Sequence, residues 1–242
     1  MATRKKTAPK GKKSSKASPP LKKRAGRWLV RALALAFALV VLLVLLFRFV
    51  NPPTGFYMLS ESRRLGGIQR DWVPLEQIAP VMARAAVAAE DANFCNHWGF
   101  DMQAIRTAIE NGSARGASTI SQQTVKNVYL WHGRSWLRKA LEAGMTPLVE
   151  TLWPKRRIIE VYLNVAEFDE GIFGVGAAAP HYFGVAAADL SATQAARLAA
   201  ILPDPKERSA SRPGDFTRKR TAQIMDGAAT IRADGRAACF ES

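Results

Sequence analysis

The sequence predicts a mostly α-helical domain preceded by a single N-terminal transmembrane helix. Two observations support this fold class. Residues 28–50 form a long apolar run that is charged only near its ends. In the rest of the chain apolar residues recur at the spacing of amphipathic helices, and the alternating pattern of β-strands is almost absent.

The positive charge of the chain is concentrated at its N-terminus. The 242 residues have a formal net charge of +15, and residues 1–27 hold eleven Lys or Arg and no acidic residue, which leaves +4 for the remainder. A segment of this composition cannot bury enough apolar surface to fold, so we expect residues 1–27 to be a disordered basic tail. The body lacks the strongly basic composition of a nucleic-acid-binding domain.

Residues 28–50 are long enough to cross the hydrocarbon core of a bilayer, which takes about 20 helical residues. A cleaved signal peptide is the alternative, but Asn51-Pro52-Pro53 follows the run where a small-residue cleavage site would be needed. We therefore expect an uncleaved anchor at 28–50 and a globular domain at 51–242. By the positive-inside rule the tail stays in the cytoplasm and the domain lies outside it.

The first long helix of the domain is expected to begin at Pro74 and to run into Glu90. Its apolar positions have helical spacing and are Leu75, Ile78, Met82, Ala85, Ala86 and Ala89. Glu90 then falls at the edge of the buried face and at the C-terminal end of the helix. Burial and the negative end of the helix dipole both disfavour a charged carboxylate, so we expect a raised pKa for Glu90.

A second helix, capped by Asp101, is expected to end at Glu110, and a small flexible loop follows at 111–117. Ser118 is the expected N-cap of a third helix. This helix places four polar residues on one face, namely Thr119, Gln123, Lys126 and Asn127.

Further helices are expected at 135–152, 156–165, 176–183, 191–203 and 215–233, with a glycine-punctuated loop at 167–176. The first of these helices carries an apolar stripe, which consists of Leu137, Leu141, Met145, Leu148 and Leu152. Ser191 with Gln194 matches a capping box, and Pro203 ends the alanine-rich helix that begins there.

Two glutamates on separate helices indicate acid–base chemistry. Glu90 is expected to have a raised pKa, and Glu142 lies one helical turn from Arg138. Between them, a glycine loop leads into a capped helix, whose free backbone N–H groups suit an anion. Together these parts suit transfer at a glycosidic or phosphate ester bond. A solvated Arg138–Glu142 salt bridge and an ordinary surface helix remain the alternatives.

No metal or nucleotide site is indicated. The three histidines, His97, His132 and His181, are widely spaced, and the two cysteines, Cys95 and Cys239, form no CxxC pair. No Walker or Rossmann glycine pattern occurs. The sequence therefore requires no cofactor.

Five motifs follow one another between residues 56 and 205. They are Glu90-Asp91-x-x-Phe94-x-x-His97-x-Gly99-x-Asp101, Gly116-x-Ser118-Thr119-Ile120-x-Gln122-Gln123-x-x-Lys126-Asn127, Arg138-Lys139-x-x-Glu142, Arg157-Ile158-Ile159-Glu160-x-Tyr162-Leu163-Asn164, and Leu190-Ser191 to Leu202-Pro203. In order and spacing they resemble the peptidoglycan glycosyltransferases, glycosyltransferase family 51. Since no Ser-x-x-Lys or Lys-Thr-Gly triplet is present, the chain is similar to the monofunctional members, without a transpeptidase domain.

The resemblance implies a lysozyme-like helical domain with a smaller membrane-associated jaw. It also implies transfer of a growing lipid-pyrophosphate-linked glycan onto the 4-hydroxyl of lipid II, with β-1,4 bonds, inversion and release of undecaprenyl pyrophosphate. The implied location is the bacterial inner membrane, with a periplasmic catalytic domain. The implied partners are lipid II, the nascent strand, the bilayer and other cell-wall synthesis proteins, and no nucleic acid.

The resemblance also assigns roles to residues. Glu90 matches the general base and Glu142 the second essential glutamate. The implied substrate and pyrophosphate contacts are Ser118, Thr119, Gln123, Lys126, Asn127, Arg134, Arg138 and Lys139. Asp91, Phe94 and His97 are expected to shape the first motif. Some members imply a divalent cation, Mg or Mn, that assists the pyrophosphate, although no carboxylate cage for it is visible.

Two departures from the family pattern involve Gln194, where many relatives have Glu, and Cys95, which lies inside the first motif. In an oxidising compartment Cys95 could pair with Cys239 in a disulfide, and two buried free thiols are the alternative. Two other functions also remain in competition, a lysozyme-like hydrolase, which likewise needs two carboxylates, and a membrane-tethered scaffold without catalysis.

Overall fold

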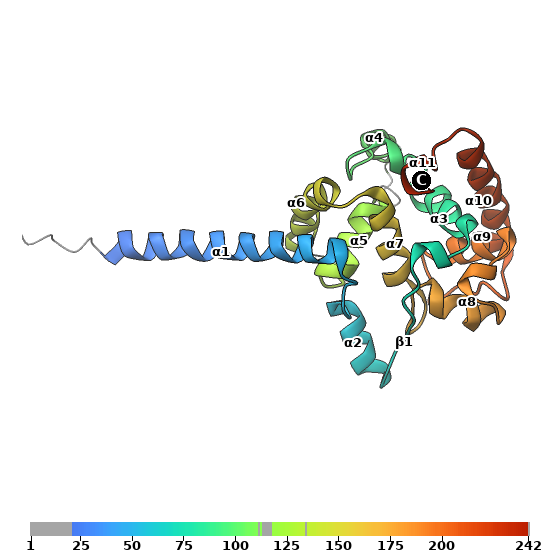
Figure 1. Cartoon of the computed structure of the whole chain (residues 1–242), viewed down its shortest axis with the longest axis horizontal. Coiled ribbons are helices and arrows are strands. Elements are labelled where there is room, and N and C mark those ends of the chain that lie inside the picture. Colours follow the sequence, from blue (N-terminus) through green and yellow to red (C-terminus); the bar gives the residue numbers. More distant parts are fainter. Residues whose placement is uncertain (1–20, 111, 113–117, 134, 242) are drawn as a thin grey trace, which may run out of the picture. The chain divides into compact units, whose positions relative to one another are not determined.

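The computed structural model describes residues 21–110, 112, 118–133 and 135–241 and confirms the mostly helical fold (Figure 1). The chain divides into two compact units, residues 1–42 and 43–242. The described part of the first unit is helical, and the second unit contains the globular domain together with the end of the apolar helix.

Helix α1, Leu21–Phe49, contains the expected anchor. Residues 26–49 have a mean hydropathy of 2.9, so this helix could cross a membrane by its length and composition. It begins seven residues earlier than predicted, and residues 21–27 of the expected disordered tail are therefore helical. Lysine, arginine and leucine are good helix formers, and extending an existing helix costs less than nucleating one. The rest of the predicted tail, residues 1–20, lies outside the described residues.

One helical group holds Glu90, the first residue of the first motif. Figure 1 shows α3, α9 and α10 side by side, and the three helices pack against one another. Their bounds are Pro80–Glu90, Ala192–Ile201 and Asp215–Ala233. The predicted capping box of α9 is confirmed, because Gln194 N donates to Ser191 Oγ and Ser191 N donates to Gln194 Oε1.

The predicted helix from Pro74 to Glu90 is divided in two. A single 3₁₀ turn, η1 (Leu75–Gln77), precedes α3, which starts only at Pro80. Proline disfavours the helical conformation for the residue before it, here Ala79, and is itself well suited to the first turn of a helix.

The second helical group forms around α5, Ile120–Tyr129, which packs against α6, Trp136–Leu152, and α7, Lys155–Val165. Helix α2, Phe56–Leu65, also contacts α5. α5 buries polar as well as apolar side chains, including Ser121, Gln122 and Thr124. It is therefore a central helix of the fold, and the surface-helix alternative is wrong.

The apolar stripe predicted for α6 does not form its buried face. Trp136 and Leu137 are 92% and 65% exposed, whereas the fully buried positions are Glu142, Thr146, Val149 and Glu150. α6 faces the domain with polar groups. Glu150 pairs with Lys155 of α7 and accepts from Ser121 of α5, whereas Glu142 pairs with Arg138 and Lys139 of α6 itself. Its apolar side is left outward.

A small sheet replaces part of the predicted loop at 167–176. Strand β2, Glu167–Asp169, pairs antiparallel with β3, Ile172–Phe173, and β3 pairs in parallel with β1, Gln69–Arg70. Strands of two or three residues are too short to show alternation in the sequence, which explains why they were missed.

The remaining elements are short connections. They are η2 (Phe94–Asn96), α4 (Met102–Glu110), α8 (Val175–Phe183), η3 (Ala187–Asp189) and α11 (Ala238–Glu241). As predicted, Asp101 caps α4, since its Oδ1 accepts from the backbone N–H groups of Gln103 and Ala104 at 3.0 and 2.9 Å. The helix at 215–233 is confirmed but is not the last, because α11 follows it.

Candidate active site

Glu90 is the last residue of α3 and is largely withdrawn from solvent. Its Oε2 accepts a hydrogen bond from Nε2 of Gln123 on α5 at 2.8 Å. Burial raises the pKa of Glu90, as predicted, and outweighs the opposing effects of the Gln123 bond and of the charges on Arg220 and Lys126. The structure thus presents a carboxylate that holds a proton more readily than an exposed glutamate does.

Asp91 joins the segment after Glu90 to the start of α5. Its Oδ2 accepts from the backbone N–H of Ile120 at 3.0 Å, and its Oδ1 lies 2.8 Å from Nε2 of His97. Because Nδ1 of His97 accepts from the backbone N–H of Gly99, Nε2 carries the proton and donates to Asp91. With both carboxylate oxygens bonded inside the protein, Asp91 is placed to shape this loop.

Phe94 is fully buried, and the ammonium of Lys155 lies 4.4 Å from the centre of its ring. The same ammonium donates to the backbone oxygen of His97 and to Glu150, both at 2.8 Å. Phe94 and His97 are therefore held inside the first motif, where a direct contact with a substrate is not available to the phenyl ring.

The N-cap of α5 is Thr119 and not Ser118. Thr119 Oγ1 accepts from Gln122 N at 3.2 Å, and Gln122 Oε1 accepts from Thr119 N at 3.0 Å, which makes a full capping box. The sequence signal was the Thr-x-x-Gln spacing. Thr119 also donates to the backbone oxygen of Gly99 at 2.7 Å. The side chain of Thr119 is therefore buried and hydrogen-bonded within the protein. Ser118 is exposed and accepts from Lys139 at 3.4 Å.

Position 99, whose backbone oxygen accepts from Thr119, requires a glycine for two reasons. Its φ is +87°, and a Cβ built there would lie 2.4 Å from Cγ2 of Thr146 on α6. A side chain at this position would therefore push α6 away from the first motif.

Glu142 is buried and paired with two cations. Its Oε2 accepts from Nη1 of Arg138 at 2.7 Å, and its Oε1 accepts from the ammonium of Lys139. Arg138 also donates to Gly133 O at 3.0 Å. Since Glu142 is only 3% exposed, the solvated salt bridge considered from the sequence is wrong. This carboxylate fixes two positive charges at the edge of the site.

Lys126 lies on α5 within the electrostatic reach of both glutamates. Burial lowers its pKa, with opposing contributions from the negative charges of Glu142 and Glu90. The structure therefore brings Glu90, Gln123 and Lys126 together. The cluster of Arg138, Lys139 and Glu142 also lies within the electrostatic reach of Lys126. Arg134, also predicted to bind pyrophosphate, lies outside the described residues.

Asn127 lies beside two stacked aromatic rings, those of His132 and Tyr57. Nε2 of His132 lies 3.1 Å from Oδ1 of Asn127, and the His132 ring stacks on Tyr57 with centroids 3.5 Å apart. Burial lowers the pKa of His132 to about 3, so its ring is neutral near neutral pH.

A pocket of about 400 Å³ opens beside these residues. Its walls include Tyr57, Gln123, Lys126, Asn127, His132 and Lys206. We call it the Lys126–Lys206 pocket. Its mixed lining of amides, cations and rings suits a polar molecule such as a sugar, and Gln123 connects it directly to Glu90.

Tyr162 of α7 also lines this pocket and is fully buried. Its hydroxyl has no hydrogen-bond partner among the described residues. Burial raises its pKa, and the charge of Glu90 adds to the shift. A buried hydroxyl is normally bonded, so this group is available to a molecule that enters the pocket.

Besides His132 and Tyr162, the sequence interpretation missed Tyr57, Glu167, Lys206 and Arg220. Tyr57 donates to Glu167 Oε2 at 2.6 Å, Lys206 binds Glu61 at 2.7 Å, and Arg220 of α10 donates to the backbone oxygen of Ala89 at 2.8 Å. Tyr57 lies more than a hundred residues from Glu167 and Lys206 in the sequence, so no local pattern marked these three residues. Arg220 is one of several cations on α10, and nothing in the sequence distinguished it from the others. Within the described part of the chain, no group of three or more His, Cys, Asp or Glu is placed to hold a metal ion.

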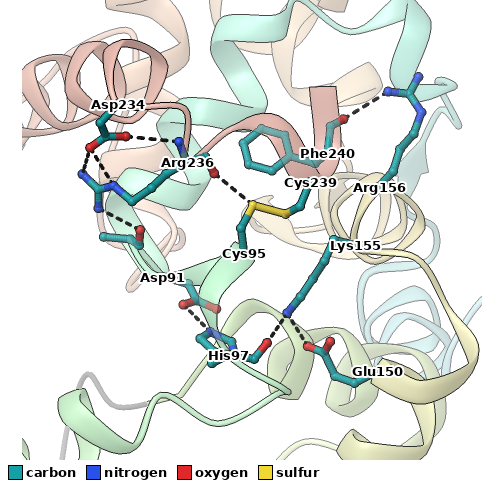
Figure 2. Close-up of a disulfide and its surroundings, with 11 residues drawn as sticks. Asp91, Cys95, His97, Glu150, Lys155, Arg156, Asp234, Arg236, Cys239 and Phe240 are labelled. Atoms are coloured by element: carbon teal, nitrogen blue, oxygen red, sulfur yellow. Dashed lines mark hydrogen bonds and ion pairs between the residues drawn. A yellow bond between two sulfur atoms is a disulfide. The ribbon is translucent and has the colours of Figure 1, made fainter. Parts of the chain in front are cut away.

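Cys95 and Cys239 are joined by a disulfide, with Cα atoms 5.7 Å apart (Figure 2). Of the two alternatives open from the sequence, the structure has the bridge. It links the first motif to α11.

Comparisons with known proteins show what the chain is similar to. The family model for transglycosylases matches residues 59–229. The chain is 59% identical over 235 residues to the biosynthetic peptidoglycan transglycosylase of Jannaschia sp. strain CCS1, covering 97% of this chain and 98% of that protein. It is 48% identical to the protein of that name from Caulobacter vibrioides, covering 88% and 97% of the two chains, and 49% identical to that of Rhodospirillum centenum, covering 88% and 96%.

Proposed function

Because the chain belongs to the transglycosylase family and is a peptidoglycan glycosyltransferase, we propose that it elongates glycan strands from lipid II. In this proposal the growing glycan, linked to lipid pyrophosphate, is transferred onto the 4-hydroxyl of the incoming lipid II. The observation that carries the proposal is the position of Glu90, a largely buried carboxylate with a raised pKa that shares Gln123 with the Lys126–Lys206 pocket.

Glu90 is the proposed general base. Its carboxylate takes the proton of the 4-hydroxyl while that oxygen forms a bond to the anomeric carbon of the donor. The bond from this carbon to the phosphate oxygen breaks on the opposite face, so the configuration inverts and a β-1,4 bond results. A base with a raised pKa suits this step, because proton transfer is most effective when the pKa lies near the working pH.

The departing undecaprenyl pyrophosphate is proposed to meet Lys126, Arg138 and Lys139. Developing negative charge is stabilised most by cations that are already in place, and Glu142 holds two of them through buried pairs. With both its oxygens engaged, Glu142 acts through these cations and does not itself take the acceptor proton. Ser118, bonded to Lys139, and Arg134 complete the proposed pyrophosphate contacts.

The donor groups of this region do not fit a divalent ion held by the protein. Mg²⁺ and Mn²⁺ prefer carboxylate and other oxygen ligands, and the two cations already bonded to Glu142, Arg138 and Lys139, repel a further cation there. No step of the proposed mechanism therefore passes through a metal.

The Lys126–Lys206 pocket is proposed to hold the acceptor sugar. It is on the same side of α5 as Gln123, and its unpaired Tyr162 hydroxyl and neutral His132 ring offer hydrogen-bonding groups to a saccharide. Asn127 orients His132 and thereby shapes the pocket wall.

The proposed location is the bacterial inner membrane, with the basic tail in the cytoplasm and the catalytic domain on the periplasmic side. Helix α1 supports a single-pass anchor. Large apolar side chains exposed on α4 and α6 support a membrane-associated jaw that draws the substrate from the bilayer, and they include Met102, Ile109, Trp136, Leu137 and Leu141. Other cell-wall synthesis proteins remain proposed partners, and nucleic acid does not.

Gel analysis of labelled lipid II incubated with the purified full-length protein tests the proposal. We expect wild type to form a ladder of glycan polymers and Glu90→Gln to lose at least about a hundredfold in rate, the usual contribution of a general base. Glu142→Gln should lose activity too, but with a lower melting temperature, because it leaves Arg138 without its buried partner.

The matched control is Glu170→Gln, which removes an exposed partner of Arg64 and should leave the rate unchanged. A wild-type rate in Glu90→Gln would exclude the assignment of the base. Release of soluble muropeptides from finished cell wall, without polymer formation from lipid II, would instead support the hydrolase.

A further inference from the structure

The C-terminal segment 234–241 lies against the loop that follows Glu90. Figure 2 shows the disulfide between Cys95 and Cys239 at the centre of this contact. Beside it, Nη1 of Arg236 donates to the backbone oxygen of Ala92 at 3.1 Å, and Arg236 is itself held by Asp234 at 2.7 Å. A covalent bond and a charged hydrogen bond thus hold two points of the same short loop.

Packing on the other side of the disulfide strengthens this contact. The rings of Phe240 and Phe94 are both fully buried, with centroids 6.2 Å apart. Nη1 of Arg156 donates to the backbone oxygen of Phe240 at 3.1 Å, and Arg84 of α3 binds Glu241 at 2.5 Å. Helix α11 therefore completes the core beneath the first motif and is more than a loose chain end.

The restrained loop is directly connected to the proposed base. Ala92 is two residues from Glu90, and the residue between them, Asp91, bonds the backbone N–H of Ile120 at the start of α5. From α5, Gln123 bonds the Glu90 carboxylate. A shift of the loop would therefore change the position of Glu90 relative to the helix that carries its partner.

We propose that segment 234–241 positions the first motif for catalysis, and that the Cys95–Cys239 disulfide makes this positioning dependent on the redox state. The inference rests on the proposed function of Glu90. Opening the bridge needs a dithiol, which gives two cysteine thiols in the protein and is itself oxidised to a disulfide. Both cysteines are partly exposed, so a small dithiol can reach the sulfur atoms.

The first experiment compares the oxidised full-length protein with the same protein treated with dithiothreitol. We expect kcat for labelled lipid II to fall about tenfold to a hundredfold, because small misplacements of a catalytic group have effects of this size, while KM changes little. The acid limb of the pH–rate profile should shift as the surroundings of Glu90 change. The Cys95→Ser/Cys239→Ser double variant should reproduce these values and show no further response to dithiothreitol.

A second variant tests the segment with the disulfide intact. Arg236→Gln removes the bond to Ala92 and should lower kcat in the same direction, whereas Arg236→Lys, which keeps a donor, should restore part of it. The matched control is Arg218→Gln, which removes an exposed Arg–Asp pair at the other end of α10 and should change neither kcat nor the pH profile.

Hydrogen–deuterium exchange gives a readout that does not depend on activity. Reduction should speed exchange in residues 91–97 and at the start of α5. If exchange rises but the oxidised wild type forms no polymer, the proposed function fails and the positioning contact stands. If the enzyme polymerises lipid II and reduction lowers only the melting temperature, with kcat, pH profile and exchange unchanged, the disulfide is a structural crosslink and the inference is wrong.

Discussion

At the scale of single residues, the surroundings of Glu90 and Glu142 separate two carboxylates that look alike in the sequence. Glu90 faces Arg220 and Lys126 without a direct ion pair, and burial raises its pKa despite both charges. Glu142 makes direct pairs with Arg138 and Lys139. One group is suited to exchange a proton, and the other is suited to hold cations.

The pH dependence of activity should reflect Glu90. A base must be deprotonated to act, so the rate falls as the pH drops through the pKa of Glu90. Because burial raises that pKa, we expect the acid limb of kcat/KM above 4.5, the pKa of a free glutamate. Steady-state rates with labelled lipid II across the pH range measure this limb. An acid limb at or below pH 4.5 would contradict the assignment of Glu90, with its raised pKa, as the base.

The Tyr162→Phe variant removes one hydroxyl group and should show whether that hydroxyl contributes to activity or to stability. The Tyr162 hydroxyl is buried without a described partner, so its removal should leave the melting temperature unchanged or raise it. If the hydroxyl bonds the acceptor sugar, the same variant should lose about three- to tenfold in kcat/KM, the value of roughly one hydrogen bond. Thermal melting and initial rates on one preparation give both answers. A lower melting temperature with unchanged kinetics would assign the hydroxyl to the fold.

At the scale of elements, α6 turns a polar face inward and an apolar face outward. The inward face contains Glu142, which holds Arg138 and Lys139, and Glu150, which binds Lys155 at 2.8 Å and Ser121. The bonds of Glu150 to α5 and α7 hold this face toward the domain, whereas the pairs of Glu142 lie within α6. In the described part of the chain, the exposed stripe on its outer side then has no partner, as expected for a helix that contacts a bilayer.

Replacing Trp136, Leu137 and Leu141 by Gln tests this orientation. Each is exposed, so the melting temperature should stay close to wild type, whereas binding to phospholipid vesicles should weaken at least about tenfold. Vesicle co-sedimentation of a protein lacking residues 1–42 isolates the effect from the anchor. The control is the double change Phe216→Gln and Met225→Gln on α10, exposed apolar residues of another helix. Equal loss in both variants would mean that α6 has no special contact with lipid.

Sequence reasoning succeeded where one short signal decides a structure. The Ser191–Gln194 capping box and the position of Glu90 at the end of a buried helix required only local spacing. It failed where tertiary contacts decide. The stripe of Leu137 and Leu141 has the spacing of a core face, but the bonds of Glu150 to Lys155 and Ser121 hold the opposite, polar face inward. Likewise Tyr57 and Lys206 meet through Glu167, which no local pattern in any of the three segments could indicate.

At the scale of the whole molecule, the last turns of α1 belong to the globular unit. Val44 is fully buried, and its backbone oxygen accepts from Nε1 of Trp153 at 2.7 Å. Arg157 donates to the backbone oxygens of Phe47 and Val50 at 3.1 and 2.9 Å. The carbonyl groups in the last turn of a helix lack partners within the helix, and Arg157 provides one for Phe47.

Two truncations should therefore differ in stability although both lack most of the apolar helix. A protein of residues 43–242 keeps the bonds to Trp153 and Arg157. In residues 51–242, Nε1 of Trp153 and Nε of Arg157 lose their partners, while the other nitrogens of Arg157 keep Glu160 and Asn51. An unpaired buried donor costs about 1–3 kcal/mol, so the shorter protein should be less stable by roughly 2–6 kcal/mol. For a domain of this size that corresponds to a melting temperature lower by roughly 5–15 °C.

Differential scanning calorimetry of the two proteins in the same detergent measures the difference. Trp153→Phe in the longer protein keeps the ring but removes the donor to Val44, and it should produce part of the loss. Equal melting temperatures for the two truncations would contradict the argument, because residues 43–50 would then contribute nothing to the domain. A difference in the expected direction would mean that the end of the anchor is a structural part of the catalytic unit, so the boundary predicted at residue 50 divides one folded unit.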